Sequence, residues 1–425
     1  MGSGVEAGLK RLLAITWSAP PLLVPRAVQV QRTLHYLSRD HGWQVHLLTV
    51  TPASVATVCP LDYSLESLYP SPERTIQVAS PESRMALRLL WRAFPALAQL
   101  PDRQRLWAER AARRVRSLAQ TEFAAVLTFS HPLSSHLVGL AAKRALGLPW
   151  IAHFSDPWTG NPFAPAASAV VRGVNARLER QVLGAADHVI FVNERLRDLT
   201  FAEMPEAPQA KVTVIPQGFD PTLTPAGSSR ARDGRLTLRY TGHLYGPRSP
   251  AGLVEALTRL SSDETASLRV SLVGRIEAEH MERLRDIVRL GLVDIEEPVP
   301  YTASLERLAE ADCLLVLDAA SKDPSPFLPS KLVDYLAFGK PIVGLTPLEG
   351  ASADLLRRLG CTVTAPDDPA SIAAALRELI AAWRSGALAP GAGFQEVAGS
   401  YDIRRTTAQL ARVLESFLPL PGCSP

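Results

Sequence analysis

Short apolar segments alternate with segments of helical periodicity along most of the chain. In the first half, apolar runs predict strands at residues 11–16, 45–51, 124–129, 150–154 and 188–192. Between successive strands, residues 26–40 and 134–146 carry apolar positions at helical spacing. Strands that alternate with helices indicate a parallel, doubly wound α/β sheet.

The second half of the chain repeats this alternation. It predicts strands at residues 236–239, 269–273, 294–298, 313–318, 341–345 and 361–365, and an amphipathic helix over residues 401–418. A break rich in proline, glycine and serine, at residues 216–221 and 225–229, separates the two halves and has the composition of a linker.

The chain has 425 residues, which is too long for one ordinary hydrophobic core. We therefore expect a Rossmann-like domain over residues 1–218, a second over residues 219–400, and a C-terminal helix and tail over residues 401–425. Two such domains joined by a hinge are expected to face each other across a cleft.

Composition narrows the class of protein. Hydrophobic residues make up 47% and charged residues 20%, as in globular proteins, and the net charge of +3 argues against a nucleic-acid binder. No apolar run is long enough to span a membrane, and the first residues do not fit a signal peptide. The four cysteines lie far apart, which fits a reducing compartment and no metal site: Cys59, Cys313, Cys361 and Cys423. We expect a cytoplasmic protein.

Residues 83–117 combine arginines with large apolar residues, and Pro101 divides them into two amphipathic helices. One interpretation is helices packed on the sheet with their arginines in solvent. The other is peripheral contact with the inner face of a membrane or with an acidic, lipid-linked acceptor. The sequence leaves both open.

Residues 327–345 carry the clearest chemical pattern. A helix is predicted to start at Ser330 and to end at Gly339, between two buried strands. This arrangement places the start of a helix, with Ser330 and Lys331, at the carboxyl edge of a parallel sheet, where anions bind. Asp334 lies one turn further on, where its carboxylate suits the hydroxyls of a ribose. The pattern therefore indicates a nucleotide-linked substrate.

This pattern resembles the GT-B glycosyltransferases of group 1 (family 4-like), which are retaining enzymes that use a nucleotide sugar. The resemblance covers nearly the whole chain and is strongest in its C-terminal half. The donor motif of the family has two glutamates eight residues apart, followed by a glycine and a proline. Asp334, Gly339 and Pro341 keep the second acid, the glycine and the proline, whereas Pro326 replaces the first acid. The resemblance also implies a C-terminal helix that crosses back to the first domain.

A second motif of the family places two cations, which neutralise the donor diphosphate, after a glycine. Gly242 keeps the glycine, and His243 and Arg248 stand in the two basic positions. Arg248 is suited to bidentate phosphate binding. Arg275 follows the next predicted strand and is a further candidate for donor binding, although an ion pair to a neighbouring glutamate is an equal alternative.

The N-terminal half resembles a subset of the family that contains a DPW segment, here at residues 156–158. Asp156 follows a predicted strand, and His131 follows the strand before it, so both are candidate catalytic residues on the acceptor side. His136, on the following helix, is expected to be structural. Trp158 is a candidate for stacking on a sugar, although burial is the commoner fate of such a residue.

Taken together, the resemblance implies a glycosyltransferase that retains the anomeric configuration and needs no metal or other cofactor. Its partners would be a nucleotide sugar and a sugar, lipid-linked or small-molecule acceptor, as in synthesis of cell-envelope polysaccharide or glycolipid. A sugar-nucleotide epimerase of similar architecture and a non-catalytic nucleotide-sugar-binding protein remain as alternatives. The replacement of the first motif acid by Pro326 keeps the second alternative open.

Overall fold

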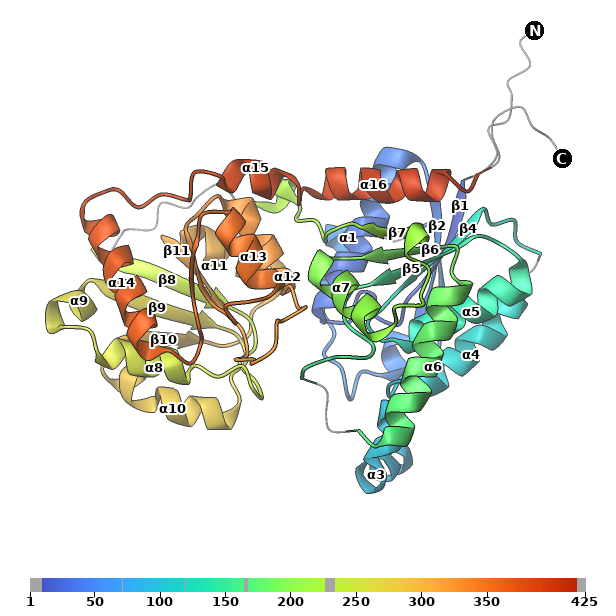
Figure 1. Ribbon diagram of the computed structural model, residues 1–425, viewed down its shortest axis with the longest axis horizontal. Coiled ribbons are helices and arrows are strands. Elements are labelled where there is room, and N and C mark those ends of the chain that lie inside the picture. Colours follow the sequence, from blue (N-terminus) through green and yellow to red (C-terminus); the bar gives the residue numbers. More distant parts are fainter. Residues whose placement is uncertain (1–9, 71, 119, 164–166, 226–233, 419–425) are drawn as a thin grey trace, which may run out of the picture. The chain divides into compact units, whose positions relative to one another are not determined.

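The computed structural model describes residues 10–70, 72–118, 120–163, 167–225 and 234–418. The chain folds into two compact units (Figure 1): the first contains residues 1–218 and 403–425, and the second contains residues 219–402. Residues 226–229 of the predicted linker and Cys423 lie outside the described residues.

The first unit is built on a parallel sheet with the strand order β3-β2-β1-β4-β5-β6-β7. The strands are β1 (Arg11–Ile15), β2 (Gln44–Val50), β3 (Arg74–Val78), β4 (Ala125–Phe129), β5 (Trp150–Phe154), β6 (His188–Phe191) and β7 (Val212–Val214). The sheet is covered on both faces. Leu13 and Ile15 of β1 belong to one buried cluster, whereas Leu12 and Ala14 belong to another. This alternation is the mark of a doubly wound sheet.

The helices of the first unit connect these strands. They are α1 (Pro25–His41), α2 (Ser64–Leu68), α3 (Met85–Ala93), α4 (Arg105–Arg116), α5 (Ser134–Leu146), α6 (Ala169–Ala185), α7 (Glu194–Glu203) and α16 (Ile403–Glu415), with short 3-10 turns η1 (Pro52–Ser54), η2 (Pro95–Gln99) and η3 (Gln209–Lys211). Local chemistry sets their ends. Helix α1 begins with Pro25 and stops at Gly42, whose φ of 69° suits a left-handed cap. The side chains of Ser168 and Asn193 accept backbone N–H bonds at the starts of α6 and α7.

The last helix returns to the first unit. Leu410 and Leu414 of α16 lie in the same buried cluster as Leu34 and Leu37 of α1, and Figure 1 shows α16, in red, beside α1. The expected return of the C-terminal helix is confirmed, because its apolar face needs the apolar face of α1 for burial.

The second unit has a parallel sheet with the order β10-β9-β8-β11-β12-β13. Its strands are β8 (Leu236–Thr241), β9 (Leu268–Val273), β10 (Val293–Glu296), β11 (Cys313–Leu317), β12 (Ile342–Leu345) and β13 (Thr362–Thr364). Strand β11 is buried throughout: Leu315 and Leu317 face one cluster, and Leu314 and Val316 face another. The second sheet is therefore doubly wound as well, and the predicted α/β class is confirmed for both units.

The helices of the second unit complete this alternation. They are α8 (Ala251–Thr258), α9 (Ser262–Ala266), α10 (Ala278–Arg289), α11 (Tyr301–Glu310), α12 (Ser330–Tyr335), α13 (Ala351–Arg358), α14 (Pro369–Arg384) and α15 (Phe394–Gly399), with 3-10 turns η4 (Pro221–Leu223) and η5 (Leu336–Phe338). Gly339 has a φ of 57° and caps the α12–η5 segment, as its position in the sequence predicted.

The arginine-rich segment forms two different kinds of helix. Helix α4 is anchored in the core of the first unit by Trp107, Ala111 and Val115. Helix α3 has no buried residue. Helix α4 thus fits the interpretation of a helix packed on the sheet, whereas membrane contact through α3 stays a prediction. Among the described residues, no helix has both the length and the apolar composition to cross a membrane.

Candidate functional site

A cluster of charged side chains lies at one edge of the second sheet. His243, Arg275 and Asp318 each follow the end of a strand, namely β8, β9 and β11. Because these strands are parallel neighbours, their carboxyl ends meet at the same edge. Arg248, in the loop after β8, and Lys331, at the start of α12, join the same cluster through the contacts described next.

Two glycines allow the loops after β8 and β9 to approach each other. Gly242 and Gly274 have φ values of 138° and 134°, which side chains rarely adopt. A Cβ atom on Gly274 would lie 2.2 Å from the carbonyl oxygen of Gly242, and one on Gly242 would lie 2.2 Å from Nζ of Lys331. The glycine predicted from the second motif is thus needed for close packing against the Lys331 ammonium group.

Lys331 is held by a buried tyrosine. Its Nζ donates a 2.6 Å hydrogen bond to the hydroxyl of Tyr240 and lies 3.9 Å from the centre of that ring. The Tyr240 hydroxyl in turn donates to the main-chain oxygen of His243 at 2.9 Å. Tyr240 was missed by the sequence analysis, because a tyrosine inside a predicted strand gives no sign of what its hydroxyl contacts.

Arg248 pairs with an acid at the end of β11. Its Nη2 lies 3.5 Å from Oδ1 of Asp318, whose Oδ2 accepts a 2.9 Å bond from Ser352. The Nε of Arg248 is buried and has no hydrogen-bond partner among the described residues. Asp318 was also missed, although it follows a buried strand as Asp156 does, and that position was a usable signal.

The cluster carries an excess of positive groups in a partly desolvated setting. Burial, followed by the charge of Arg248, holds the pKa of Lys331 well below its ordinary value. Burial, followed by the charges of Arg275 and Lys331, lowers the pKa of His243. Burial raises the pKa of Asp318, while Arg248 opposes that rise. The repulsion among these positive groups falls if one of them loses its proton, and it also falls if an anion binds between them.

The remaining donor candidates lie on α12 but differ in surroundings. Ser330 is half-buried at the first position of this helix. Asp334 lines a small depression together with Tyr301, Phe338 and Leu223. Lys331 and Arg248 are not among the residues that line this depression. The structure thus gathers His243, Arg248, Arg275 and Lys331, and sets Asp334 apart from them on the same helix.

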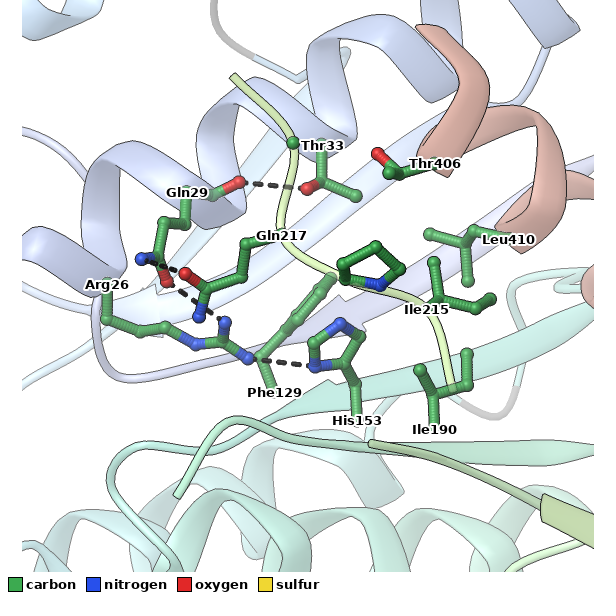
Figure 2. Close-up of a pocket in the computed structure, with 12 residues that line it drawn as sticks. Arg26, Gln29, Thr33, Phe129, His153, Ile190, Ile215, Gln217, Thr406 and Leu410 are labelled. Atoms are coloured by element: carbon green, nitrogen blue, oxygen red, sulfur yellow. Dashed lines mark hydrogen bonds between the residues drawn. The ribbon is translucent and has the colours of Figure 1, made fainter. Parts of the chain in front are cut away.

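A second polar group lies in the first unit, around Arg26 (Figure 2). Its Nη2 donates to Nδ1 of His153 at 3.0 Å, and its Nη1 donates to Oε1 of Gln29 at 3.2 Å. Gln29 donates to Oε1 of Gln217 at 2.5 Å, and these residues line a pocket with about 420 Å³ of empty space, part of it open to solvent. Burial lowers the pKa of Arg26 to about 10, while the charge of Asp156 opposes that change.

Of the two candidate catalytic residues, Asp156 lies near this group. Asp156 accepts a 2.6 Å bond from Ser155, and its charge acts on Arg26. His131 is exposed in the loop after β4, where its main-chain oxygen accepts a 2.9 Å bond from Ser18. Arg26 was missed because only the apolar face of its predicted helix was considered.

His136 and Trp158 have structural surroundings. Nδ1 of the buried His136 lies 2.7 Å from the hydroxyl of Thr128, and burial lowers the pKa of His136 to about 3. The indole of Trp158 is buried and donates to Asn175 of α6 at 2.9 Å. Each side chain is thus committed to the core. For Trp158 this removes the ring from a sugar-stacking role.

Within the described ranges, no group of three or more His, Cys, Asp or Glu side chains is placed to hold a metal ion. The charged groups that gather at the edge of the second sheet are mostly cations, which suits an anionic ligand rather than a metal.

Part of the chain matches a known protein family. Residues 27–218 match the glycosyl transferase 4-like domain family. Comparison with curated protein sequences gave no match.

Solved structures share the fold over almost the whole chain. Anabaena Alr3699/HepE, in complex with UDP, has a TM-score of 0.66 and 16% sequence identity, over 96% of this chain and 99% of that chain. Sucrose-phosphate synthase from Thermosynechococcus elongatus has a TM-score of 0.68 and 15% identity, over 96% and 98%. A putative UDP-N-acetylglucosamine 2-epimerase from Listeria monocytogenes has a TM-score of 0.59 and 12% identity, over 96% and 96%.

These likenesses define the fold of the protein. The chain has the two-domain, Rossmann-like α/β fold that GT-B glycosyltransferases share, and the segment that matches the glycosyl transferase 4-like domain family lies in its first unit. Membership of the group 1 glycosyltransferases and of their DPW-containing subset stays a prediction.

Proposed function

We propose that the protein is a retaining glycosyltransferase that moves a sugar from a nucleotide diphosphate sugar to an acceptor. The observation that carries this proposal is the gathering of Arg248, Lys331, His243 and Arg275 at the carboxyl edge of the second sheet. A diphosphate is the ligand that such a set of cations suits best. The UDP complex of the Anabaena protein of the same fold agrees with this choice.

The cations would act on the leaving group. As the bond between the sugar and the diphosphate breaks, negative charge builds on the β-phosphate, and preformed positive groups lower the energy of that state. Arg248 is the principal group, because it stays charged and its Nε has no hydrogen-bond partner among the described residues. The diphosphate would also raise the pKa of Lys331 and His243, so that both take up protons when the donor binds.

Charged side chains, rather than the start of helix α12, are proposed to provide most of the stabilisation of the leaving diphosphate. Helix α12 has six residues, so its dipole is small. Ser330 is proposed to bind a phosphate oxygen. Asp334 is proposed to bind the ribose, which requires the nucleoside to extend along α12 from the cations toward the depression that Asp334 lines.

On the acceptor side, Asp156 and His131 are proposed to handle the proton of the acceptor hydroxyl. Pro326 stands where the family has its first acid, so a covalent intermediate on that position is excluded by residue type. The proposal therefore has the acceptor attack while the diphosphate leaves, with no metal required. The acceptor classes remain a growing polysaccharide, a glycolipid precursor or a small molecule.

An epimerase is the second candidate, since the putative epimerase from Listeria shares the fold. The two activities differ in their products. An epimerase converts the nucleotide sugar in the absence of an acceptor, whereas a transferase leaves the sugar configuration unchanged and releases the nucleoside diphosphate.

The decisive experiment uses the purified protein and a panel of UDP, GDP and ADP sugars. Donor binding is measured by thermal shift, and products are then followed by mass spectrometry with candidate acceptors. Arg248→Ala is expected to weaken donor binding by at least about tenfold, which corresponds to loss of one charged hydrogen bond. Arg283→Ala, an exposed arginine of α10 that pairs with Glu279, is the matched control. Equal donor binding by Arg248→Ala and the wild-type protein would refute the proposed site.

A further inference from the structure

Helix α3 and turn η2 present large apolar side chains to solvent. The exposed fractions are 63% for Met85, 57% for Leu89, 40% for Leu90, 59% for Phe94 and 46% for Leu97. Leu87 and Trp91, on the opposite side of the helix, are half-buried. Single exposed apolar residues are ordinary, but five within one short segment make an apolar patch, and such patches mark interaction sites.

The start of α6 extends this patch. Val170 and Val174 lie one turn apart on α6 and are 73% and 36% exposed. The side chain of Asn175 donates a 2.8 Å bond to the main-chain oxygen of Gln99 in η2, which ties α6 to the α3 segment. Figure 1 shows α3 beside that end of α6. We call the seven residues Met85, Leu89, Leu90, Phe94, Leu97, Val170 and Val174 the α3 surface.

A stripe of positive charge lies along one side of this surface. Arg84, Arg88 and Arg92 recur every fourth residue, so they follow one another along the helix next to Met85 and Leu89. All three are exposed, and none has an ion pair to a carboxylate among the described residues. Residues 83–117 contain nine arginines but only two acids. An apolar face edged by unpaired guanidinium groups is complementary to a surface that is apolar inside and anionic outside.

We infer that the α3 surface docks on a lipid bilayer that carries anionic headgroups. The apolar side chains would enter the boundary between headgroups and acyl chains, and the arginine stripe would bind lipid phosphates. A second copy of the chain fits less well, because a symmetric contact through this surface would bring two arginine stripes together. An anionic bilayer can contact both the apolar side chains and the arginine stripe of this surface.

Docking itself does not depend on the proposed transferase function. If that function is also correct, docking holds the first unit, which carries the acceptor-side candidates, at the membrane. The acceptor is then a lipid-linked molecule presented by the bilayer, and this last step rests on the proposed function.

The test measures sedimentation of the full-length protein with vesicles of phosphatidylcholine alone or mixed with phosphatidylglycerol. One variant, Leu89→Asp with Phe94→Asp, places charge in the α3 surface. A second, Arg84→Gln with Arg88→Gln and Arg92→Gln, removes the stripe. The wild-type protein is expected to bind only the mixed vesicles, and more weakly at high salt. The arginine variant is expected to bind about 100-fold more weakly, and the aspartate variant to lose binding.

Matched controls come from α10 in the second unit. Val288→Asp with Leu290→Asp changes two residues that are 37% and 70% exposed. Arg283→Gln with Arg285→Gln and Arg289→Gln removes the same charge as the stripe variant. Both controls are expected to bind mixed vesicles as the wild-type protein does. All altered positions are on the surface, so unchanged thermal unfolding is expected to show that each variant is folded.

Three results would overturn the inference. The wild-type protein could fail to bind mixed vesicles, or it could bind both vesicle types equally. The α3 and α10 variants could also lose vesicle binding to the same extent. Self-association that the aspartate variant abolishes, without vesicle binding, would assign the surface to a second copy instead. Donor binding, measured by thermal shift on the same variants, is expected to be unchanged. Vesicle binding without any transfer would keep docking and reject the proposed function, so the two are separable.

Discussion

The Nζ atom of Lys331 occupies the space that a side chain at Gly242 would need, with only 2.2 Å between Nζ and the position of a Cβ atom. The glycine and the lysine lie far apart in the sequence and meet at the edge of the second sheet. A glycine is therefore favoured at position 242 for two reasons. A side chain there would collide with Lys331, and the backbone has a φ that side chains rarely adopt.

Gly242→Ala should displace the Lys331 side chain from Tyr240 and weaken donor binding by at least about tenfold. Gly291→Ala is the control, because Gly291 also has a positive φ, 69°, but has no atom near its Cβ position. Both variants should lose some stability, and only Gly242→Ala should lose nucleotide affinity. Isothermal titration with the best nucleotide measures this. Equal losses of affinity in the two variants would show that backbone strain, not Lys331, is responsible.

Lys331→Met should weaken donor binding by about tenfold or more, because it removes the amine that is proposed to take up a proton when the donor binds. The fold should stay stable, because methionine keeps a side chain of similar length and removes a partly buried polar group. The pH dependence gives a second measure. Since the pKa of Lys331 is lowered in the folded state, the unfolded chain binds the extra proton. This contribution therefore makes the folded protein more stable as pH rises toward the ordinary lysine pKa of 10.5.

The methionine variant should lose that rise in stability between neutral pH and pH 10, as measured by urea unfolding. Lys322→Met, at an exposed lysine, should keep it. A methionine variant with the pH profile of the wild-type protein would show that Lys331 keeps its proton in the folded state.

Glu179→Gln should stabilise the first unit at neutral and alkaline pH. Glu179 is buried and accepts bonds from the backbone N–H and the hydroxyl of Thr159. Burial raises its pKa to about 7 from 4.5. The folded state thus holds a proton that the unfolded chain releases, so this group destabilises the fold progressively as pH rises from 4.5 to 7. The full effect is roughly 3 kcal/mol at most.

Urea unfolding of Glu179→Gln at pH 5 and pH 8 measures the effect, and the gain should be present mainly at pH 8. Glu122→Gln, at an exposed glutamate, should behave as the wild-type protein at both pH values. No difference between the two pH values for Glu179→Gln would place the pKa of Glu179 near its ordinary value.

Trp158→Phe should lower the free energy of unfolding by about 1 kcal/mol, since it removes the hydrogen bond to Asn175 and keeps most of the ring. Trp158→Ala should cost about 3–5 kcal/mol, because the ring is buried. Donor affinity should stay unchanged in both. If the variants instead kept their stability and had a higher KM for the acceptor, Trp158 would be assigned to sugar binding.

Periodicity predicted the fold well because both sheets are buried on their two faces. A run such as Leu314–Leu317 is apolar at every position, and the polar loops around it fix its length as that of a strand. The same reasoning singled out Lys331, which lies at a predicted helix start, whereas His243 and Arg248 were suggested by the spacing of a family motif.

The sequence could not predict which side chains that are distant along the chain contact each other. Nothing local to Tyr240 indicates that its hydroxyl joins Lys331 to the loop after β8. Arg26 lies on a helix whose apolar residues dominated the pattern, and its contact with His153 crosses more than a hundred residues of chain. For α3, periodicity identified an amphipathic helix, but only its neighbours decide whether the apolar face is covered.

The return of α16 to α1 has a consequence for biosynthesis. The first 218 residues leave the ribosome long before Leu410 and Leu414 are synthesised. The apolar side of α1 is therefore exposed while the second unit is being made. The earliest-made unit is thus the last to be completed, and chaperones have a ready target in the nascent chain until its final helix emerges.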